Sequence, residues 1–259
     1  YKDFPGSTEM DRGYSPSPVA YNNTILVKLG GANHAIVAMN PKDGAVIWAK
    51  HSFGNSPGTP VLVKVGTRDI MLTPFASEIA ALDPSTGNLL WSHPHKTDYG
   101  LNITTPLFTR GDNIVTITSA YSGGARGIQL AADGTRPREL WQHNRLRVHF
   151  TSALEIDGYV YGSSGDFGPS PLTCVEVKTG KVMWQDRTFS KGNLVRTGDK
   201  TILLTEDGTL ALLNLSPQGL RVLARADQIT LEKSWTAPSL VGTTLYVRDR
   251  RHILALDLR

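Results

Sequence analysis

Short apolar segments separated by turns run along the whole chain. In the stretch Ile79–Trp91, two apolar runs flank the turn Asp-Pro-Ser-Thr-Gly, and the second run ends on a tryptophan. Alternating apolar and polar residues joined by a turn rich in Pro, Asp and Gly are typical of a β-hairpin. Variants of this hairpin recur, and a repeat at a fixed period indicates the architecture before any single residue is interpreted.

The tryptophans mark the period of the repeat. Trp91 follows Trp48 by 43 positions, and Trp184 follows Trp141 by the same interval. The intermediate step, from Trp91 to Trp141, is 50 positions, which we attribute to a longer Ser/Gly-rich loop at 121–127. The repeat predicts six units of short strands, at residues 14–50, 51–93, 94–143, 144–186, 187–226 and 227–259.

The last two units depart from this pattern. Leu223 stands near the position of the expected tryptophan in the fifth unit, and the sixth unit stops before a fourth strand. Four short antiparallel strands per unit at this period predict an all-β protein, a single β-propeller domain over residues 1–259. A blade cannot bury both faces alone. We therefore expect residues 1–10 to supply the missing strand and close the ring; the alternative is a six-unit part of a larger propeller.

The recurring hairpin reads Ala-(Leu/Met)-(Asp/Asn)-x-x-(Thr/Asp)-Gly-x-(Val/Leu)-(Ile/Leu/Met)-Trp. It stands at 38–48 and 81–91, with weaker copies ending at Trp141 and Trp184. This motif resembles the repeat of the pyrroloquinoline-quinone-type (PQQ-like) β-propeller family. The resemblance implies six four-stranded PQQ-like units, or part of an eight-bladed propeller, because many members have more blades.

The same resemblance implies two kinds of function. The family includes quinone-dependent dehydrogenases and cofactor-free members, among them the lipoprotein scaffold of the outer-membrane β-barrel assembly machinery. It implies a periplasmic or secreted location. Because the chain opens on Tyr1, we expect that a signal peptide or a longer segment has been removed.

Charge and hydropathy exclude some partners. The 27 basic and 23 acidic residues are scattered without a long run, so a nucleic-acid partner has no support. No apolar run approaches the roughly 20 residues that cross a bilayer, so we predict no membrane span. Cys174 is the only cysteine. An intramolecular disulfide is therefore impossible.

The repeated tryptophans are interpreted as structural. Trp48, Trp91, Trp141 and Trp184 occupy one repeat position, where each would fix an outer strand to the adjoining blade. Trp235 breaks the register and precedes the first strand of the sixth unit. It is a candidate binding anchor, with core packing as the alternative.

Histidines and arginines gather in two of the connections between units. The sequence His93-Pro-His95 followed by Asp98 superficially resembles the spacing of metal ligands. A zinc site normally needs three or four ligands, and neither H-E-x-x-H nor paired C-x-x-C is present, so no metal is predicted. A surface for anions or an acidic partner is favoured instead, with a solvated loop as the alternative, and it comprises Arg145, Arg147, His149, Arg187 and Lys191.

An oxidoreductase is the alternative function. The alcohol-oxidising branch of the family carries an adjacent cysteine pair and a Glu/Asn/Asp calcium site, whereas this chain has Cys174 alone. We therefore predict no cofactor, with pyrroloquinoline quinone as the alternative. A quinone-dependent or sugar-directed enzyme would use a polar centre over the central channel, built from Asn102, Thr104, His149, Thr151, Asn193 and Trp235.

The sequence favours a non-enzymatic, extracytoplasmic binding or scaffolding propeller that acts as a monomer. One loop face, formed by connections between blades and by loops between second and third strands, would hold a protein or a small polar ligand. The candidate binding residues are His51, His93, Asp98, Asn102, Arg145, Arg147, His149, Phe167, Arg187, Asn193 and Trp235.

Overall fold

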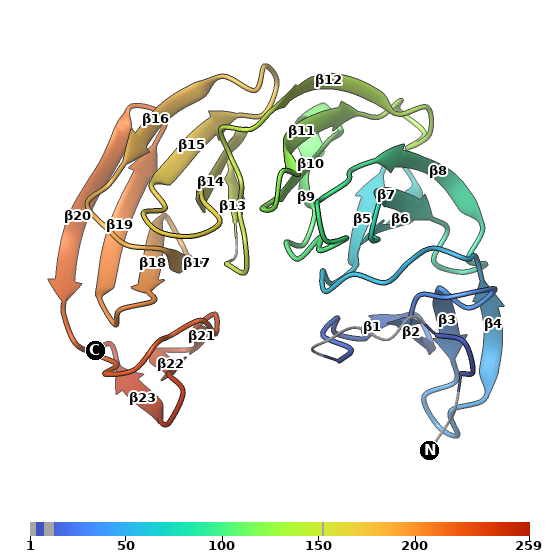
Figure 1. Ribbon diagram of the computed structural model, residues 1–259, viewed down its shortest axis with the longest axis horizontal. Coiled ribbons are helices and arrows are strands. Elements are labelled where there is room, and N and C mark those ends of the chain that lie inside the picture. The colour runs from blue at the N-terminus through green and yellow to red at the C-terminus, as the bar shows by residue number, and fades with distance from the viewer. Residues whose placement is uncertain (1–3, 8–12, 152) are drawn as a thin grey trace. The chain divides into compact units, whose positions relative to one another are not determined.

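The computed structural model of the chain describes residues 4–7, 13–151 and 153–259. These residues form six antiparallel sheets, five with four strands and the last with three. The helical content of the described residues is one turn of 3-10 helix, η1, at Arg110–Asp112. The all-β, six-sheet organisation predicted from the repeat is confirmed (Figure 1).

The chain divides into two compact units, Tyr1–Gln142 and His143–Arg259, here called the N-terminal half and the C-terminal half. The single-domain organisation stays a prediction. Three sheets belong to the N-terminal half. Their strands are β1 (Val19–Tyr21), β2 (Thr24–Lys28), β3 (Ile36–Met39) and β4 (Val46–Lys50); β5 (Val61–Val65), β6 (Arg68–Pro74), β7 (Glu78–Leu82) and β8 (Leu89–Pro94); β9 (Leu107–Thr109), β10 (Ile114–Ser119), β11 (Gly124–Gln129) and β12 (Arg138–His143).

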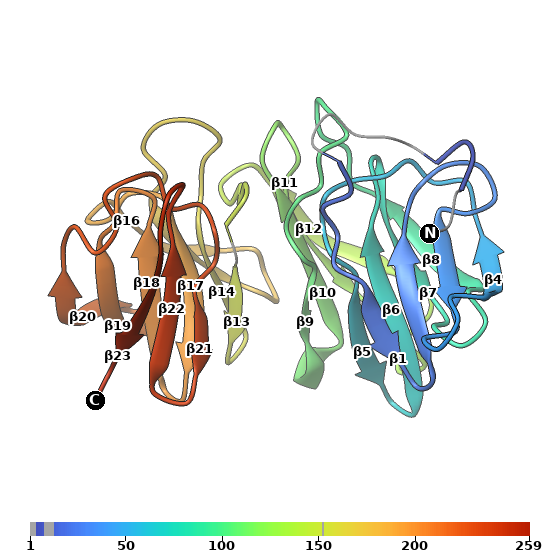
Figure 2. The same cartoon turned by 90° about the horizontal axis from the view of Figure 1, so that it is seen from below.

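The C-terminal half contains the other three sheets. Their strands are β13 (Leu154–Ile156), β14 (Tyr159–Ser163), β15 (Leu172–Glu176) and β16 (Val182–Asp186); β17 (Gly192–Thr197), β18 (Lys200–Thr205), β19 (Leu210–Ser216) and β20 (Gly219–Ala226); β21 (Ser239–Val241), β22 (Thr244–Arg248) and β23 (Ile253–Asp257). Figure 2 shows β17, β18 and β19 running alongside one another in this half.

The core lies between successive sheets. In the second sheet Leu72 pairs with Ala81, and Ala81 pairs with Trp91, so the three side chains form one row across β6, β7 and β8. This row packs against Val115 and Ile117 of β10 in the next sheet. The alternation of side chains along its strands thus gives the second sheet two apolar faces, one packed on the first sheet and one on the third.

A β-bulge recurs at one position of the repeat. The register shifts directly after Ala38, Ala81, Cys174 and Leu212, each on the third strand of its sheet. A bulge adds local twist to a strand pair. In the first, second and fourth sheets it stands just before the turn that leads to the outer strand, whereas in the fifth sheet the pairs from Leu213↔Val222 to Ser216↔Gly219 separate it from the turn.

Trp48, Trp91 and Trp184 make the same contact. Trp48 Nε1 donates to Ser85 O at 3.0 Å, Trp91 Nε1 to Gly134 O at 3.0 Å, and Trp184 Nε1 to Ser216 O at 2.8 Å. Each acceptor lies in or at the start of the connection between third and fourth strands of the following sheet. The indole therefore links each outer strand to the hairpin of its neighbour.

The glycine of the turn is needed for this contact. Gly87 has φ +71°, and a Cβ atom there would lie 2.6 Å from the Trp48 ring. Positive φ and close approach both favour glycine. Asp83 Oδ1 accepts from Ser85 N at 2.8 Å and from Thr86 N at 3.1 Å, which accounts for the acidic residue as a turn former.

In the third sheet, the predicted Ser/Gly-rich loop is shorter than expected. Residues 121–127 were expected to form a loop, but β11 begins at Gly124 and pairs with β10 through Ser119↔Gly124. The four residues Ala120, Tyr121, Ser122 and Gly123 are enough to turn the chain. The extra residues of this repeat lie instead in the β9–β10 turn, which holds η1, and in the long β11–β12 connection.

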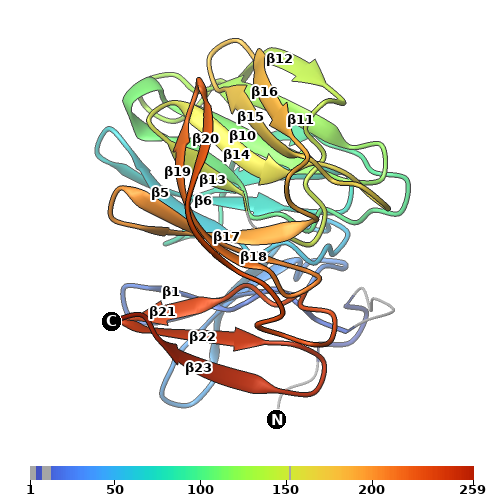
Figure 3. The same cartoon turned by 90° about the vertical axis from the view of Figure 1, so that its left-hand side faces the viewer.

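The last sheet has three strands among the described residues, with β23 at its edge (Figure 3). The predicted closing strand, residues 1–10, falls largely outside the described residues. Its described part is a turn, in which Ser7 N donates to Phe4 O at 3.1 Å. Closure of a ring by this segment stays a prediction.

The contact between Trp91 and Gly134 predicts a large effect of mutation. Trp91 is only 6% exposed, so Trp91→Ala should lower the free energy of unfolding by about 3–5 kcal/mol through lost packing and the cavity left behind. Urea denaturation followed by circular dichroism measures this. Ile47→Ala is the matched control, because this outer-strand side chain is 53% exposed and such changes stay within about 0.5 kcal/mol.

Candidate functional site

The predicted binding residues fall into two sets. One set lies in the N-terminal half, at His51, His93, Asp98 and Asn102, and the other lies in the C-terminal half, at Arg145, Arg147, His149, Arg187, Asn193 and Trp235. Thr104 belongs with the first set and Thr151 and Phe167 with the second.

Asn102 holds three segments of the N-terminal half together. Its side chain is fully buried, and Nδ2 donates to Phe75 O at 2.6 Å and to His95 O at 2.8 Å. Its Oδ1 accepts from Ser119 Oγ at 2.7 Å. Because its amide donates to two carbonyls and its oxygen accepts from the hydroxyl, Asn102 acts as a brace between loops.

His95 continues this buried network. Arg126 Nε donates to His95 Nδ1 at 3.0 Å, so Nδ1 is the acceptor and the proton lies on Nε2. Nε2 then donates to Ser119 Oγ at 3.1 Å. A histidine in this tautomer cannot accept the hydroxyl proton, so the Ser119–His95 pair is not an activated nucleophile.

The network ends on a partly exposed carboxylate. Arg126 Nη1 lies 2.5 Å from Glu139 Oε2, and His93 Nε2 lies 3.6 Å from the same oxygen. Burial, together with the positive charges of Arg126 and His93, lowers the pKa of His95 to about 3. His95 is therefore neutral in the folded protein at neutral pH.

His51 has a structural role in joining one sheet to the next. It has φ +65°, and its Nε2 lies 2.7 Å from Gly87 O in the turn of the next sheet. His143 makes the equivalent contact in the C-terminal half, with Nε2 2.8 Å from Gly180 O. Both histidines follow a repeated tryptophan and bind the turn glycine of the neighbouring sheet, a role that sequence reasoning missed.

Lys28 is a second residue that the sequence did not single out. It is 2% exposed, and its Nζ donates to Gly58 O at 2.6 Å, Pro74 O at 2.7 Å and Ser56 Oγ at 3.1 Å. Burial lowers the pKa of Lys28 well below its usual value, because no carboxylate is among these three acceptors. The ammonium group joins β2 to the second sheet and its entry segment.

An aromatic cluster lies in the C-terminal half. The Phe150 and Trp235 rings are 4.9 Å apart, and the His149 ring lies 5.2 Å from Phe150 and 6.2 Å from Phe167. Trp235 comes from the β20–β21 connection, Phe167 from the β14–β15 loop, and His149 and Phe150 from the β12–β13 connection. Three connections therefore contribute to one cluster, which sequence reasoning reached only in part because it missed Phe150.

Charged groups surround this cluster. Lys191 Nζ donates to Asp166 O at 2.7 Å and lies 5.0 Å from the Phe150 ring centre. Arg147 Nη1 lies 3.5 Å from Asp166 Oδ2. Burial lowers the pKa of Lys191, while the carboxylates of Glu206 and Asp166 oppose this shift.

Trp235 is fixed from three directions. Its Nε1 donates to Glu206 Oε2 at 2.9 Å, and its backbone oxygen accepts from Asn193 Nδ2 at 3.2 Å. The Arg250 guanidinium lies 5.2 Å from the ring centre, within the range of a cation–π contact. The orientation of the indole is therefore set before any ligand arrives.

The cluster has a buried base and an exposed rim. Asn193 and Lys191 are 1% and 5% exposed, whereas Trp235 is 45% exposed and Phe167 is 80% exposed. Arg145 and Arg187 are exposed on the connections that enter β13 and β17. We call the aromatic cluster, taken with two of the arginines near it, the Trp235 surface. It comprises Arg147, Phe150, Phe167, Trp235 and Arg250.

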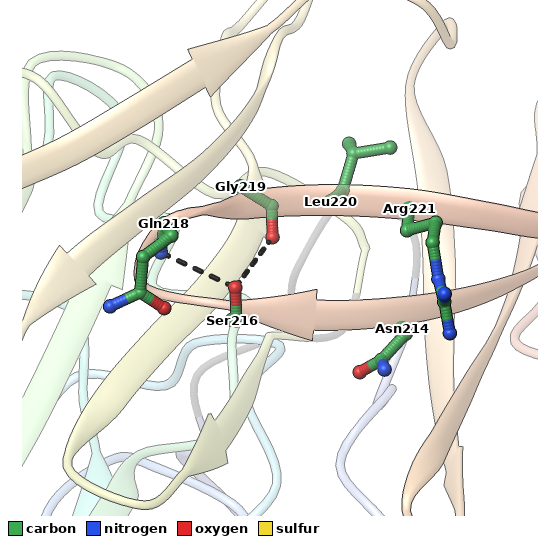
Figure 4. Close-up of a pocket in the computed structure, with 6 residues that line it drawn as sticks. All are labelled: Asn214, Ser216, Gln218, Gly219, Leu220 and Arg221. Atoms are coloured by element: carbon green, nitrogen blue, oxygen red, sulfur yellow. Dashed lines mark hydrogen bonds between the residues drawn. The ribbon is translucent and has the colours of Figure 1, made fainter.

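A shallow hollow of about 310 Å³ lies elsewhere in the same half, along the β19–β20 hairpin. Figure 4 shows Ser216 between Gln218 and Gly219, with its Oγ donating to Gly219 O at 3.1 Å and accepting from Gln218 N at 3.3 Å. Its lining contains no predicted binding residue. The hollow belongs to the hairpin turn and is distinct from the Trp235 surface.

Comparison with known proteins assigns the family. Residues 7–186 match the family described as outer membrane protein assembly factor BamB, a span of more than half of the 259 residues. The chain belongs to this family. No curated protein sequence matches the chain.

Solved structures show the same fold as this BamB-family chain. BamB from Moraxella catarrhalis superposes with a TM-score of 0.69 at 20% identity, covering 96% of this chain and 70% of that chain. A europium-containing methanol dehydrogenase gives 0.61 at 14% identity, covering 86% of this chain and 52% of that chain. Quinohemoprotein alcohol dehydrogenase ADHIIG from Pseudomonas putida HK5 gives 0.63 at 12% identity, covering 96% and 52%. The chain thus spans about half the length of these dehydrogenases, and the likeness establishes a PQQ-like propeller fold.

The residues of this BamB-family chain do not fit the quinone site that the resemblance implies. Cys174 has no cysteine beside it, is fully buried on β15, and pairs across the sheet with Tyr161 and Trp184. Burial raises the pKa of its thiol to about 11. Among the described residues, no group of three or more His, Cys, Asp and Glu side chains is arranged to hold a metal ion.

No helix within residues 4–7, 13–151 and 153–259 has the length and apolar character needed to span a bilayer.

The buried His95 makes stability depend on pH. Its folded pKa of about 3 lies below the unfolded value near 6.5, so the unfolded state binds the extra proton. Stability from the neutral imidazole is complete above pH 6.5 and is lost as pH falls toward 3. Between pH 7.5 and pH 5, His95 should contribute a loss of about 2 kcal/mol, measured by urea denaturation. His95→Gln, which keeps a donor and an acceptor, should lack this part of the loss; an unchanged pH profile would contradict the assignment.

Proposed function

We propose that the chain is a non-enzymatic scaffolding propeller whose Trp235 surface holds an acidic segment of a protein partner. The observation that carries this proposal is the exposed Trp235, which is fixed by Glu206 and Asn193 and has the Arg250 guanidinium 5.2 Å from its ring centre. Interface hot spots are enriched in Trp and Arg on well-supported positions. A preoriented indole contributes contact area with little further loss of side-chain entropy.

The charges around the indole favour an acidic partner. Arg145 and Arg187 are exposed on neighbouring connections, and the Arg147–Asp166 and Lys233–Glu206 pairs are long, at 3.5 and 3.6 Å. Partly exposed pairs of this kind are weak. Their cations remain available to a carboxylate of the partner, whose arrival would be steered by the same charges.

Membership of the BamB family supports a protein partner over a small polar ligand. The family is described as an outer membrane protein assembly factor. On this basis the proposal places the chain in the periplasm, acting as a monomeric binding module. The sugar- or quinone-directed alternative has no comparable support, because Asn102 is a brace between loops and Cys174 is inert.

Site-specific crosslinking tests the proposed surface. A photoreactive phenylalanine analogue at Phe167 should give a discrete protein adduct in cells, because this side chain is 80% exposed at the rim. Adding Arg145→Glu and Arg147→Glu should reduce the adduct at least about fivefold by placing like charges opposite the partner. The adduct yield is read from immunoblots and the partner from mass spectrometry.

Arg196→Glu is the matched control, since Arg196 is exposed near the β17–β18 turn. Arg196→Glu should leave the yield of the adduct unchanged. The substitutions Arg145→Glu, Arg147→Glu and Arg196→Glu should each leave the melting temperature within a few degrees of that of the unsubstituted protein. An adduct insensitive to the Arg145 and Arg147 changes, or a partner without an acidic segment, would reject the Trp235 surface as an acidic-segment site.

A quinone titration tests the alternative directly. Pyrroloquinoline quinone with Ca²⁺ should leave both the absorbance spectrum and the melting temperature of the purified protein unchanged. A ligand of the folded state at 100 times its dissociation constant would stabilise by about 2.7 kcal/mol, which calorimetry detects readily. A saturable rise in melting temperature would favour the oxidoreductase.

A further inference from the structure

A second exposed aromatic group lies in the N-terminal half. Asp98 and Tyr99 are on the β8–β9 connection, and Tyr121 and Ser122 are on the β10–β11 loop. We call these four residues the Tyr99 patch. None of them belongs to the repeated hairpin.

Two loops are locked together at this patch. Asp98 N donates to Tyr121 O at 2.9 Å, and Ser122 Oγ donates to Asp98 Oδ2 at 2.6 Å. Within the first loop, Leu101 N donates to Thr97 Oγ1 at 2.7 Å. A Cβ on Gly123 would come within 2.9 Å of Thr97 Cγ2, so the loops approach as closely as a glycine permits.

The backbone of the second loop is strained. Tyr121 and Ser122 have φ +51° and +68° in succession. Residues with a Cβ adopt this left-handed region at an energetic cost, and such strain persists where the surroundings impose it. Both residues are hydrogen-bonded to Asp98, Tyr121 through its backbone oxygen and Ser122 through its hydroxyl, so the loop presents its side chains from a tethered backbone.

Tyr99 is the exposed element of the patch. It is 71% exposed, and its ring meets Tyr121 edge to face, with centroids 5.1 Å apart and planes at 89°. Edge-to-face pairs are a favoured aromatic geometry. In this arrangement the two rings hold each other's orientation while the Tyr99 ring stays open to solvent.

The patch is electronegative. Ring faces carry negative quadrupole density, and the patch also contains the Asp98 carboxylate, one oxygen of which accepts from Ser122 Oγ. Among the described residues, Asp98 forms no ion pair with a lysine, arginine or histidine. A carboxylate next to an open aromatic face is the combination that recognises a guanidinium or ammonium group.

We propose that the Tyr99 patch binds an arginine-containing extended segment of a partner protein. The guanidinium stacks on the Tyr99 ring and donates to the Asp98 carboxylate. Arginine fits better than lysine, because its planar fork satisfies both the ring face and the carboxylate. This surface is opposite in charge to the Trp235 surface and does not depend on it.

Nuclear magnetic resonance titration tests the proposal on the whole chain. The probe is acetyl-Gly-Arg-Gly-Arg-Gly-amide, and its counterpart carries citrulline, which keeps the shape without the charge. The arginine peptide should shift the backbone amide signals of 97–101 and 120–123 in a saturable manner. Asp98→Asn and Tyr99→Ala should each weaken the apparent affinity about three- to tenfold, and the citrulline peptide should show the same weakening.

Matched controls keep the test decisive. Asp98→Asn retains a side-chain oxygen that can accept from Ser122 Oγ. It therefore removes the negative charge and keeps the hydrogen bond between the two loops. Asp199→Asn removes the same charge from an exposed turn, and Tyr246→Ala removes a tyrosine that is 43% exposed; neither should change the affinity. Equal shifts with citrulline, or equal weakening by Asp199→Asn, would overturn the proposal.

A further variant separates this proposal from the acidic-partner surface. Trp235→Ala should leave the peptide titration unchanged while reducing the crosslinked adduct of the C-terminal half. If Trp235→Ala abolished the peptide-induced shifts, the Tyr99 patch would be rejected as the arginine-binding site, whether or not the yield of the crosslinked adduct changed.

Discussion

The hydrogen bond from a tryptophan indole to the hairpin of the next sheet is the contact on which the structure depends. A twisted sheet of this kind has two apolar faces and cannot bury both of them alone. Trp48, Trp91 and Trp184 each carry a large apolar ring to the adjoining sheet and satisfy their only polar group on its chain. The turn glycine makes this contact possible, since Gly87 has no Cβ atom and leaves room for the Trp48 ring. His51 then binds the same turn. Sheet-to-sheet attachment is therefore encoded within the hairpin motif.

This coding explains why the fold could be predicted from the sequence. The repeat fixed the number of sheets, the position of each outer strand and the role of turn residues such as Asp83, because all of these follow from local sequence. The position of the extra residues in the third sheet was wrong. Serine and glycine in 121–127 suggested a loop, but cross-strand pairing placed Gly124–Gly127 in β11, where Gly127 accommodates the Trp141 ring. Tertiary packing overrode local propensity there.

The candidate sites were less predictable, because their chemistry depends on contacts distant in the sequence. The spacing of His93, His95 and Asp98 resembles that of metal ligands only superficially, and the partners of His95 are Arg126 and Ser119, which lie on other strands. Nothing in the sequence near Lys28 shows that its ammonium meets Gly58 and Pro74. Trp235 was recognisable because it breaks the repeat, whereas Phe150 and Glu206, which orient it, carry no signal of their own. The sequence therefore identifies the exposed Trp235 but not the residues that orient its side chain.

Buried polar groups and exposed aromatic groups thus have separate tasks in this chain. The Asn102–Ser119–His95–Arg126 network uses its donors and acceptors internally, and a satisfied buried network rigidifies the loops that it joins. Rigid loops lower the entropy that a binding surface loses when a partner arrives. The Asn102 network borders the connection that carries Tyr99, and Lys191 and Asn193 support the connections around Trp235. Residues that resemble catalytic groups in the sequence therefore serve binding indirectly, by fixing the loops from which the aromatic side chains project.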